Sequence, residues 1–175
     1  MRELAARRWV ANGDTLLVQG PPGVGKSHLA VALGREAVRA GYSVLLTPAT
    51  ALVTALTTGQ TEGRLDERLT RCAKPKLLII DEFGYLPLEP HAAHLFFALV
   101  SRRYERGSLL VSSNRSVSEG GTVLNGQVVA TAILDRLLHH SHVLTIQGDS
   151  YRRREKRRSG LLKANTVPAP AGASA

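Results

Sequence analysis

The chain carries, at residues 20–27, the stretch Gly20-Pro21-Pro22-Gly23-Val24-Gly25-Lys26-Ser27, directly after the apolar run Leu16-Leu17-Val18. This stretch matches the pattern G-x-x-x-x-G-K-[ST], in which backbone N–H groups surround a polyphosphate. Lys26 would add a positive charge near the β- and γ-phosphates, and the Ser27 hydroxyl would ligate Mg²⁺. His28 opens a run of helix formers, so the phosphates should lie at a helix N-terminus. The stretch predicts nucleotide binding.

Short apolar segments alternate with helix-forming segments along the rest of the chain. We expect strands at Thr15–Val18, Ser43–Thr47, Leu77–Ile80, Ser108–Ser112 and His142–Ile146. We expect helices at Lys26–Ala40, at about Thr50–Thr57, and at Leu65–Ala73, Ala92–Arg106 and Gln127–His139. This order favours an α/β fold with a five-stranded, mostly parallel sheet sandwiched by helices. The polar, glycine-containing stretch Asn114–Gly126 should be a long surface loop.

A pair of acidic residues, Asp81 and Glu82, follows the apolar strand Leu77–Ile80. Ligands of open α/β sheets bind at the carboxyl ends of the strands. Asp81 can hold the Mg²⁺ shell, and Glu82 is placed to orient and deprotonate an attacking water. The alternative is an acidic pair that merely faces solvent. A water-activating carboxylate disfavours a small-molecule kinase, which must exclude water.

Two further polar residues are candidates for contacts to the phosphates. Asn114 follows the strand at Ser108–Ser112, where its amide can bond the attacking water or the γ-phosphate. Arg136 stands among apolar neighbours near a helix end, and it could act on a phosphoryl group of another subunit. Simpler interpretations are a turn residue for Asn114 and a surface ion pair of Arg136 with Asp135.

Other polar and aromatic residues have simpler explanations. Trp9 could stack on adenine, but a packed helix face is an equally good interpretation. His139, His140 and His142 have no partner cysteine, so helix-end capping and packing are favoured over metal binding. Cys72 is the only cysteine of the chain, which excludes an internal disulfide and fits a reducing cytoplasm.

Positive charge is concentrated near the C-terminus. The chain has a formal net charge of +9, and two thirds of that excess lies between Tyr151 and Lys163. Candidate DNA-phosphate contacts in this segment are Arg153, Arg154, Lys156, Arg157 and Arg158. A solvated tail is the alternative. Residues 164–175 have the composition of a disordered tail, and the sequence shows neither a signal peptide nor a membrane span.

The chain closely resembles the IstB-like ATPases, transposition helper proteins of insertion sequences that are related to DnaC-type helicase loaders within the AAA+ class. The resemblance covers residues 4–163, and residues 1–163 would form one AAA+ ATP-binding domain that includes the basic segment 150–163. It is carried by the phosphate loop and by residues 27–30, 79–87, 101–108, 112–114, 133–140 and 150–152.

The resemblance implies roles for individual residues. Residues 20–28 with Lys26 and Ser27 correspond to Walker A, Asp81 and Glu82 to Walker B, and Asn114 to sensor 1. Arg136 matches an arginine finger, and Arg152 matches a sensor-2-like arginine in a truncated lid. Proteins of this family assemble on DNA in an ATP-dependent manner and help a transposase act on its target. From the motif residues we expect ATP and Mg²⁺ as ligands, and from the basic segment we expect DNA binding that is largely independent of sequence.

The chain departs from the family pattern at two places. Almost nothing precedes the phosphate loop where relatives carry an N-terminal region for assembly and partner contacts. The loop after Asn114 has Gly120 and Gly121 where a tryptophan is usual. Two alternatives to a transposition ATPase therefore stay open, namely a loader of a replicative helicase and a truncated nucleotide-binding relic without a partner.

Overall fold

The computed structural model describes residues 8–83, 89–115, 127–148 and 150–151. Its five strands form one sheet in the order β2-β3-β4-β1-β5, and every pair of neighbours is parallel. The strands are Thr15–Gln19 (β1), Val44–Pro48 (β2), Leu77–Phe83 (β3), Ser108–Ser113 (β4) and Ser141–Thr145 (β5). The α/β fold with a five-stranded sheet sandwiched by helices is therefore confirmed.

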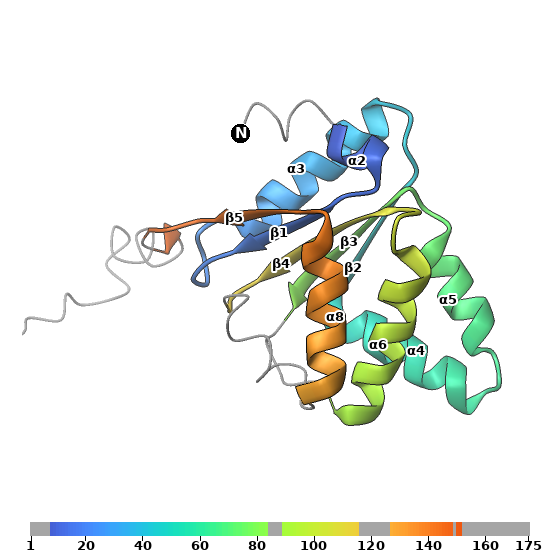
Figure 1. The fold of residues 1–175 in the computed structure, drawn as a ribbon. Helices are drawn as coiled ribbons and strands as arrows, with labels where there is room; N and C mark the ends of the chain where they lie inside the picture. The colour runs from blue at the N-terminus through green and yellow to red at the C-terminus, as the bar shows by residue number, and fades with distance from the viewer. Residues whose placement is uncertain (1–7, 84–88, 116–126, 149, 152–175) are drawn as a thin grey trace, which may run out of the picture.

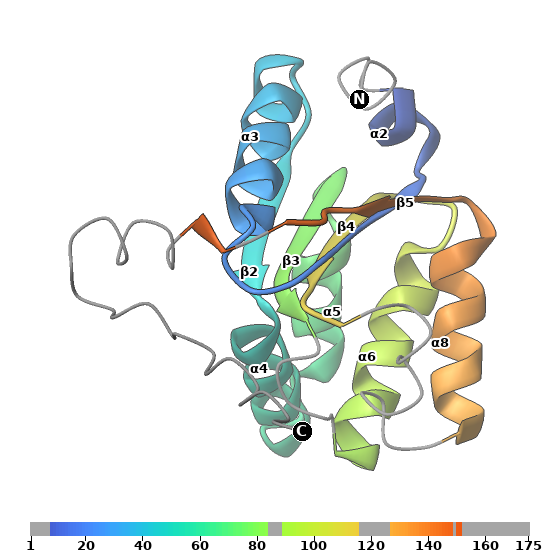
Figure 2. The same cartoon turned by 90° about the vertical axis from the view of Figure 1, so that its left-hand side faces the viewer.

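Helices cover both faces of the sheet (Figure 1). Their bounds are Arg8–Asn12 (α2), Lys26–Arg39 (α3), Ala49–Thr61 (α4), Leu65–Ala73 (α5), Pro90–Arg103 (α6) and Gln127–His139 (α8). The view turned by 90° shows α2 and α3 on one face and the other four on the opposite face (Figure 2). In the part of the chain that the structure describes, no helix is long and apolar enough to cross a membrane.

The alternation of side chains along the central strand divides the core into two clusters. Leu77 and Ile79 pack on the face covered by α2 and α3, while Leu78 and Ile80 pack against α4, α5, α6 and α8. All four side chains are fully buried, which explains why β3 is continuously apolar. Trp9 of α2 is also buried, in the first of these clusters. Packing is thus its role, and the adenine-stacking interpretation is excluded.

The bounds of three helices differ from the sequence-based expectation. Helix α3 ends at Arg39, one residue before the expected Ala40. Helix α4 extends to Thr61, beyond the expected Thr57. Helix α6 begins at Pro90, a residue suited to a first turn, and ends at Arg103 instead of Arg106. The early end of α6 has a tertiary cause, because the side chain of Arg103 is drawn into the interior.

Arg103 is only 1% exposed and has no carboxylate partner among the described residues. Its guanidinium donates hydrogen bonds of 2.7–3.2 Å to backbone carbonyl oxygens of Cys72, Ala73, Pro75, Lys76 and Ser108. Burial lowers its pKa to about 10, so the side chain stays protonated at neutral pH. This cation joins the end of α5 to the starts of β3 and β4. Cys72, a free thiol, is buried beside it as expected for a small core residue.

We predict that Arg103→Met lowers the free energy of unfolding by about 3 kcal/mol or more, because several buried carbonyl groups lose their donor. The matched control is Arg102→Met. Arg102 is adjacent in sequence but bonds Asp66 and Thr70 at the surface, so its loss should change stability by no more than about 1 kcal/mol. Urea denaturation of both variants provides the measurement, and equal losses would contradict the structural role of Arg103.

Candidate nucleotide-binding site

A cavity of about 410 Å³ opens at the carboxyl edge of the sheet. The parallel pairing of β1, β3 and β4 brings the ends of these strands to that edge. The residues that line the cavity are Pro22, Gly23, Val24, Gly25, Lys26, Ser27, His28, Glu82, Ser112, Asn114 and Tyr151. Most of the sequence-predicted phosphate-loop residues, together with Glu82 and Asn114, therefore surround one space.

The loop leads into the N-terminus of α3. Gly25 immediately precedes the helix with φ +96, a conformation that favours glycine. No side chain caps this helix start, so its first N–H groups stay available to an anion. A Cβ atom on Gly23 would clash with the Ser150 hydroxyl, so only glycine fits there. The backbone N–H of Tyr151 also donates to the carbonyl oxygen of Gly23, which joins the start of the C-terminal segment to the loop.

The Lys26 ammonium group bridges the start of the loop. It donates to the carbonyl oxygens of Gly20 at 2.7 Å and Pro21 at 2.9 Å. Partial burial lowers the pKa of Lys26, while the carboxylates of Asp81 and Glu82 act in the opposite direction. A polyphosphate in the cavity would add further negative charge beside this cation.

Ser112 is a functional candidate that the sequence-based interpretation did not assign. This buried hydroxyl at the end of β4 donates a hydrogen bond to Asp81 Oδ1 and accepts one, at 3.1 Å, from the backbone N–H of Glu82. It thus positions both residues of the acidic pair. The one available signal was a hydroxyl at the end of an apolar strand expected beside the Asp81 strand, and the sequence does not show which side chain this hydroxyl bonds.

Glu82 departs from regular strand geometry. Its φ of +60 is unusual for a residue with a side chain, and the β3–β4 register shifts between Ile80 and Phe83. The shift turns the Glu82 carboxylate into the cavity, while Asp81 is retained by Ser112. Backbone strain of this kind, on the order of 1–3 kcal/mol, is concentrated at functional sites.

Asn114 presents a polar atom that lacks a partner. Its Oδ1 is buried without a hydrogen bond to any of the described residues, although the side chain lines the cavity. A buried acceptor of this kind is normally satisfied by water or a ligand. The placement fits a hydrogen bond that Oδ1 accepts from a water molecule, while the amide nitrogen of the same side chain could donate to a phosphate.

Arg136 lies at the other edge of the sheet. It shares a small cavity with residues 12–15, which lead into and start β1, and its guanidinium lies 4.5 Å from the ring centre of Phe97. Among the ion pairs of the described residues, none joins Arg136 to Asp135. Since a five-residue strand spans roughly 16 Å, Arg136 cannot reach the phosphate loop of its own chain.

Several predicted site residues lie outside the described residues. These are Arg152, Arg153, Arg154, Lys156, Arg157 and Arg158, together with the truncated lid and residues 116–126 of the expected loop. Tyr151, which no sequence argument selected, lines the cavity with a largely exposed side chain.

Comparison with known proteins identifies close relatives. The sequence pattern of the family described as IstB-like ATP binding protein matches residues 1–159. An ATP-binding protein of insertion sequence IS21 from Pseudomonas aeruginosa is 47% identical over 96% of this chain and 63% of its own length. One of insertion sequence IS5376 from Geobacillus stearothermophilus is 45% identical over 90% of this chain and 62% of its own length. The chain thus spans about three fifths of these relatives.

Solved structures with the same fold belong to replication proteins. The DnaC helicase loader superposes with a TM-score of 0.69 at 22% identity, over 82% of this chain and 87% of its own. AMPPCP-bound DnaA from Aquifex aeolicus superposes with a TM-score of 0.70 at 21% identity, over 95% of this chain and 51% of its own. The fold is therefore that of AAA+ P-loop proteins.

We predict that Ser112→Ala weakens Mg²⁺-dependent nucleotide binding about tenfold, because Asp81 loses the hydroxyl that orients it. Binding without Mg²⁺ should change little. Titration of a fluorescent ADP analogue, with and without Mg²⁺, measures both. Ser113→Ala is the matched control, since that hydroxyl accepts only from the Arg115 backbone N–H among the described contacts. Equal behaviour of the two variants would exclude the positioning role of Ser112.

Proposed function

The chain belongs to the family of IstB-like ATP-binding proteins, and from that premise we propose that it hydrolyses ATP, assembles on DNA and assists the transposase of an insertion sequence. The observation that carries the proposal is the cavity at the carboxyl edge, where Lys26, Glu82 and Asn114 converge. The names of the relatives, which are ATP-binding proteins of insertion sequences, support the biological setting.

Different residues of the cavity have different roles in ATP hydrolysis. The loop N–H groups and Lys26 bind and orient the polyphosphate. Glu82, with its carboxylate exposed in the cavity, accepts a proton from the attacking water. Asn114, which lines the same cavity and has an unpartnered Oδ1, helps to orient that water.

The donor set also fits a magnesium ion. The Ser27 hydroxyl and the Asp81 carboxylate are hard oxygen ligands, and Asp81 is held in position by Ser112. When bound, Mg²⁺ neutralises charge on the phosphate oxygens. Ser27 and Asp81 would hold the ion, while Glu82 stays free to act as a base.

The position of Arg136 favours action between subunits. It lies at the edge of the sheet opposite to the phosphate loop, so a nucleotide that it contacts must belong to another chain. An arginine supplied in this way stabilises charge on the transferring phosphoryl group. A head-to-tail assembly satisfies this requirement, because each chain offers a different edge to its two neighbours.

We expect this assembly to form on DNA. The basic segment from Arg153 to Arg158 would contact phosphates without reading bases, so binding should be insensitive to sequence and weakened by salt. Arg152, which directly precedes this basic segment, would contact the nucleotide as a sensor, since its neighbour Tyr151 lines the cavity. We place this activity in the cytoplasm, where chromosomal DNA and ATP are available.

Glu82→Gln should retain Mg²⁺-nucleotide binding and nearly abolish ATP turnover, because an amide cannot accept the proton from water. Phosphate release in the presence of DNA measures the turnover. Asp81→Asn serves as the contrast and should weaken Mg²⁺-nucleotide binding itself. Turnover of Glu82→Gln within a few-fold of the parent would exclude Glu82 as the base.

The same Glu82→Gln variant identifies the partner. Since it should accumulate in the ATP-bound assembly, it can be incubated on DNA with purified transposase and purified replicative helicase in equal amounts. Retention of the transposase supports a transposition helper. Retention of the helicase alone would overturn that proposal in favour of a helicase loader.

Arg136→Ala should leave nucleotide binding intact while it reduces DNA-stimulated hydrolysis on the order of 10³-fold. Mixing this variant with Lys26→Ala should restore part of the activity, because one junction then combines an intact pocket with an intact arginine. Steady-state hydrolysis of the variants, alone and mixed, is the measurement.

Phe97→Leu is the control for a purely structural effect of Arg136. It removes the ring beneath the guanidinium but keeps the charge, so activity should stay within a few-fold of the parent. If Phe97→Leu loses as much activity as Arg136→Ala and mixing rescues neither, Arg136 acts only through packing.

A further inference from the structure

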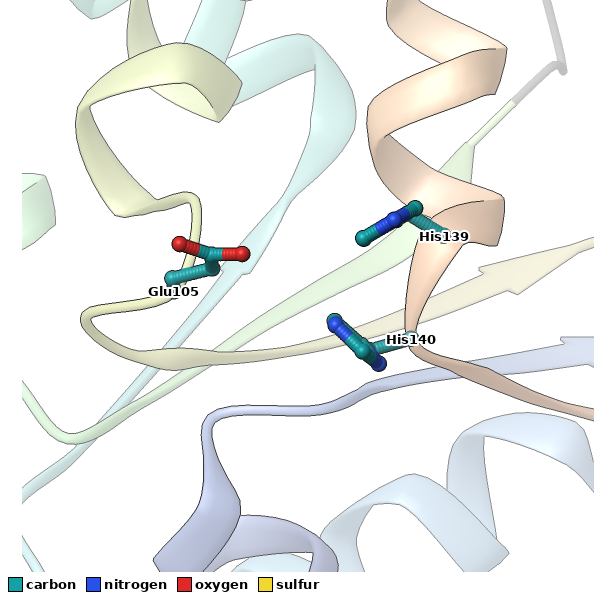
Figure 3. Close-up of side chains that lie close together, drawn as sticks. All are labelled: Glu105, His139 and His140. Atoms are coloured by element: carbon teal, nitrogen blue, oxygen red, sulfur yellow. The ribbon is translucent and has the colours of Figure 1, made fainter.

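Three side chains with metal-ligating groups meet at the amino edge of the sheet, remote from the phosphate loop. Glu105 lies in the turn between α6 and β4, and His139 and His140 lie where α8 leads into β5. One potential ligand atom of each lies within 4.8 Å of the other two. Figure 3 shows the carboxylate and both imidazoles directed into the same space.

We propose that Glu105, His139 and His140 form a binding site for a divalent transition-metal ion, for which Zn²⁺ is the best match. Two imidazole nitrogens and one carboxylate are ligands that Zn²⁺ prefers, whereas Mg²⁺ requires oxygen ligands. All three side chains are exposed, so a fourth position stays open to water or to a group from a partner.

The distances are compatible with this assignment. Zinc–ligand bonds of about 2.0–2.1 Å in tetrahedral geometry place the ligand atoms about 3.3 Å apart. The present separations, up to 4.8 Å, close to that value by rotation of exposed side chains. The two histidine rings meet edge to face, with ring centres 4.3 Å apart.

Tyr104 contacts one of the proposed metal ligands. Its hydroxyl lies 2.7 Å from Nδ1 of His139, and a partner of this kind fixes the tautomer and orientation of a metal-bound imidazole. With Nδ1 engaged, Nε2 of His139 is the nitrogen left to bind the metal. This pairing across 35 residues joins α8 to the end of α6.

Charged groups of both signs surround the site. Glu105 supplies a carboxylate to the cluster, while Arg136 shares a small cavity with Glu105 and His140. The guanidinium of Arg136 lies 4.5 Å from the ring centre of Phe97. His142 is no member of the cluster, because its Nε2 faces Asp14 at 3.3 Å.

Glu105 adopts a backbone conformation that is unfavourable for a residue with a side chain. Its φ is +58, a conformation adopted more readily by glycine or asparagine. The turn would therefore be less strained with glycine or asparagine at this position, yet the residue found there carries a carboxylate. The sequence could not suggest this member of the cluster, because Glu105 lies 34 residues before His139.

The test is a calorimetric titration of the full chain, free of any purification tag and treated with chelator, with ZnCl₂ in excess Mg²⁺. We expect one Zn²⁺ per chain at this site, and a higher melting temperature when Zn²⁺ is present. Glu105→Gly, His139→Asn and His140→Asn should each weaken Zn²⁺ binding at least about tenfold. Glu105→Gly also relieves the turn, so its loss of binding cannot be ascribed to misfolding.

Two control variants exclude other binding sites. His142→Asn removes the neighbouring histidine, and Glu82→Gln alters the phosphate-binding cavity; both should bind Zn²⁺ like the parent. Absence of Zn²⁺ binding to the parent at 100-fold excess over the protein would overturn the proposal. So would undiminished binding in the Glu105 and histidine variants, or an equal loss in His142→Asn or Glu82→Gln.

Discussion

Parallel pairing of β1, β4 and β3 is the constraint on which the rest of this molecule depends. The strands are buried on both faces, so polar side chains find places only where the strands end. The phosphate loop continues β1, the acidic pair continues β3, and Ser112 and Asn114 terminate β4. Residues nearly a hundred positions apart thus share one cavity because their strands point the same way.

The nucleotide cavity also needs departures from regular geometry. The positive φ of Glu82 and the register shift beside it allow two adjacent carboxylates to lie at one end of the sheet, where Glu82 lines the cavity and Asp81 accepts a hydrogen bond from Ser112. A regular strand would place these neighbours on opposite faces of the sheet. The other end of the sheet has a comparable irregularity at Glu105, in the turn that faces the end of α8.

Local patterns in the sequence predicted much of this fold, and long-range contacts account for what they missed. Apolar runs identified all five strands, and helix-forming composition identified α5 and α8 with their observed bounds. The end of α6 was misplaced because a basic residue at a helix terminus is ordinarily solvated, whereas Arg103 is buried. The link from Ser112 to Asp81 was missed because it joins side chains 31 residues apart, and neighbouring strands alone do not reveal which side chains at their ends are bonded.

The hydrogen bonds of Arg103 determine which substitutions this part of the chain can tolerate. Its acceptors are all main-chain carbonyl groups, which every amino acid carries, so the side chains at the accepting positions are free to change without loss of the hydrogen bonds. No charge reversal elsewhere can compensate for a substitution of the arginine itself, because no acidic partner among the described residues takes part. The tolerance is therefore asymmetric: Arg103 is under strong constraint, whereas the accepting positions are constrained only where their own side chains are buried, as at Cys72 and Ser108.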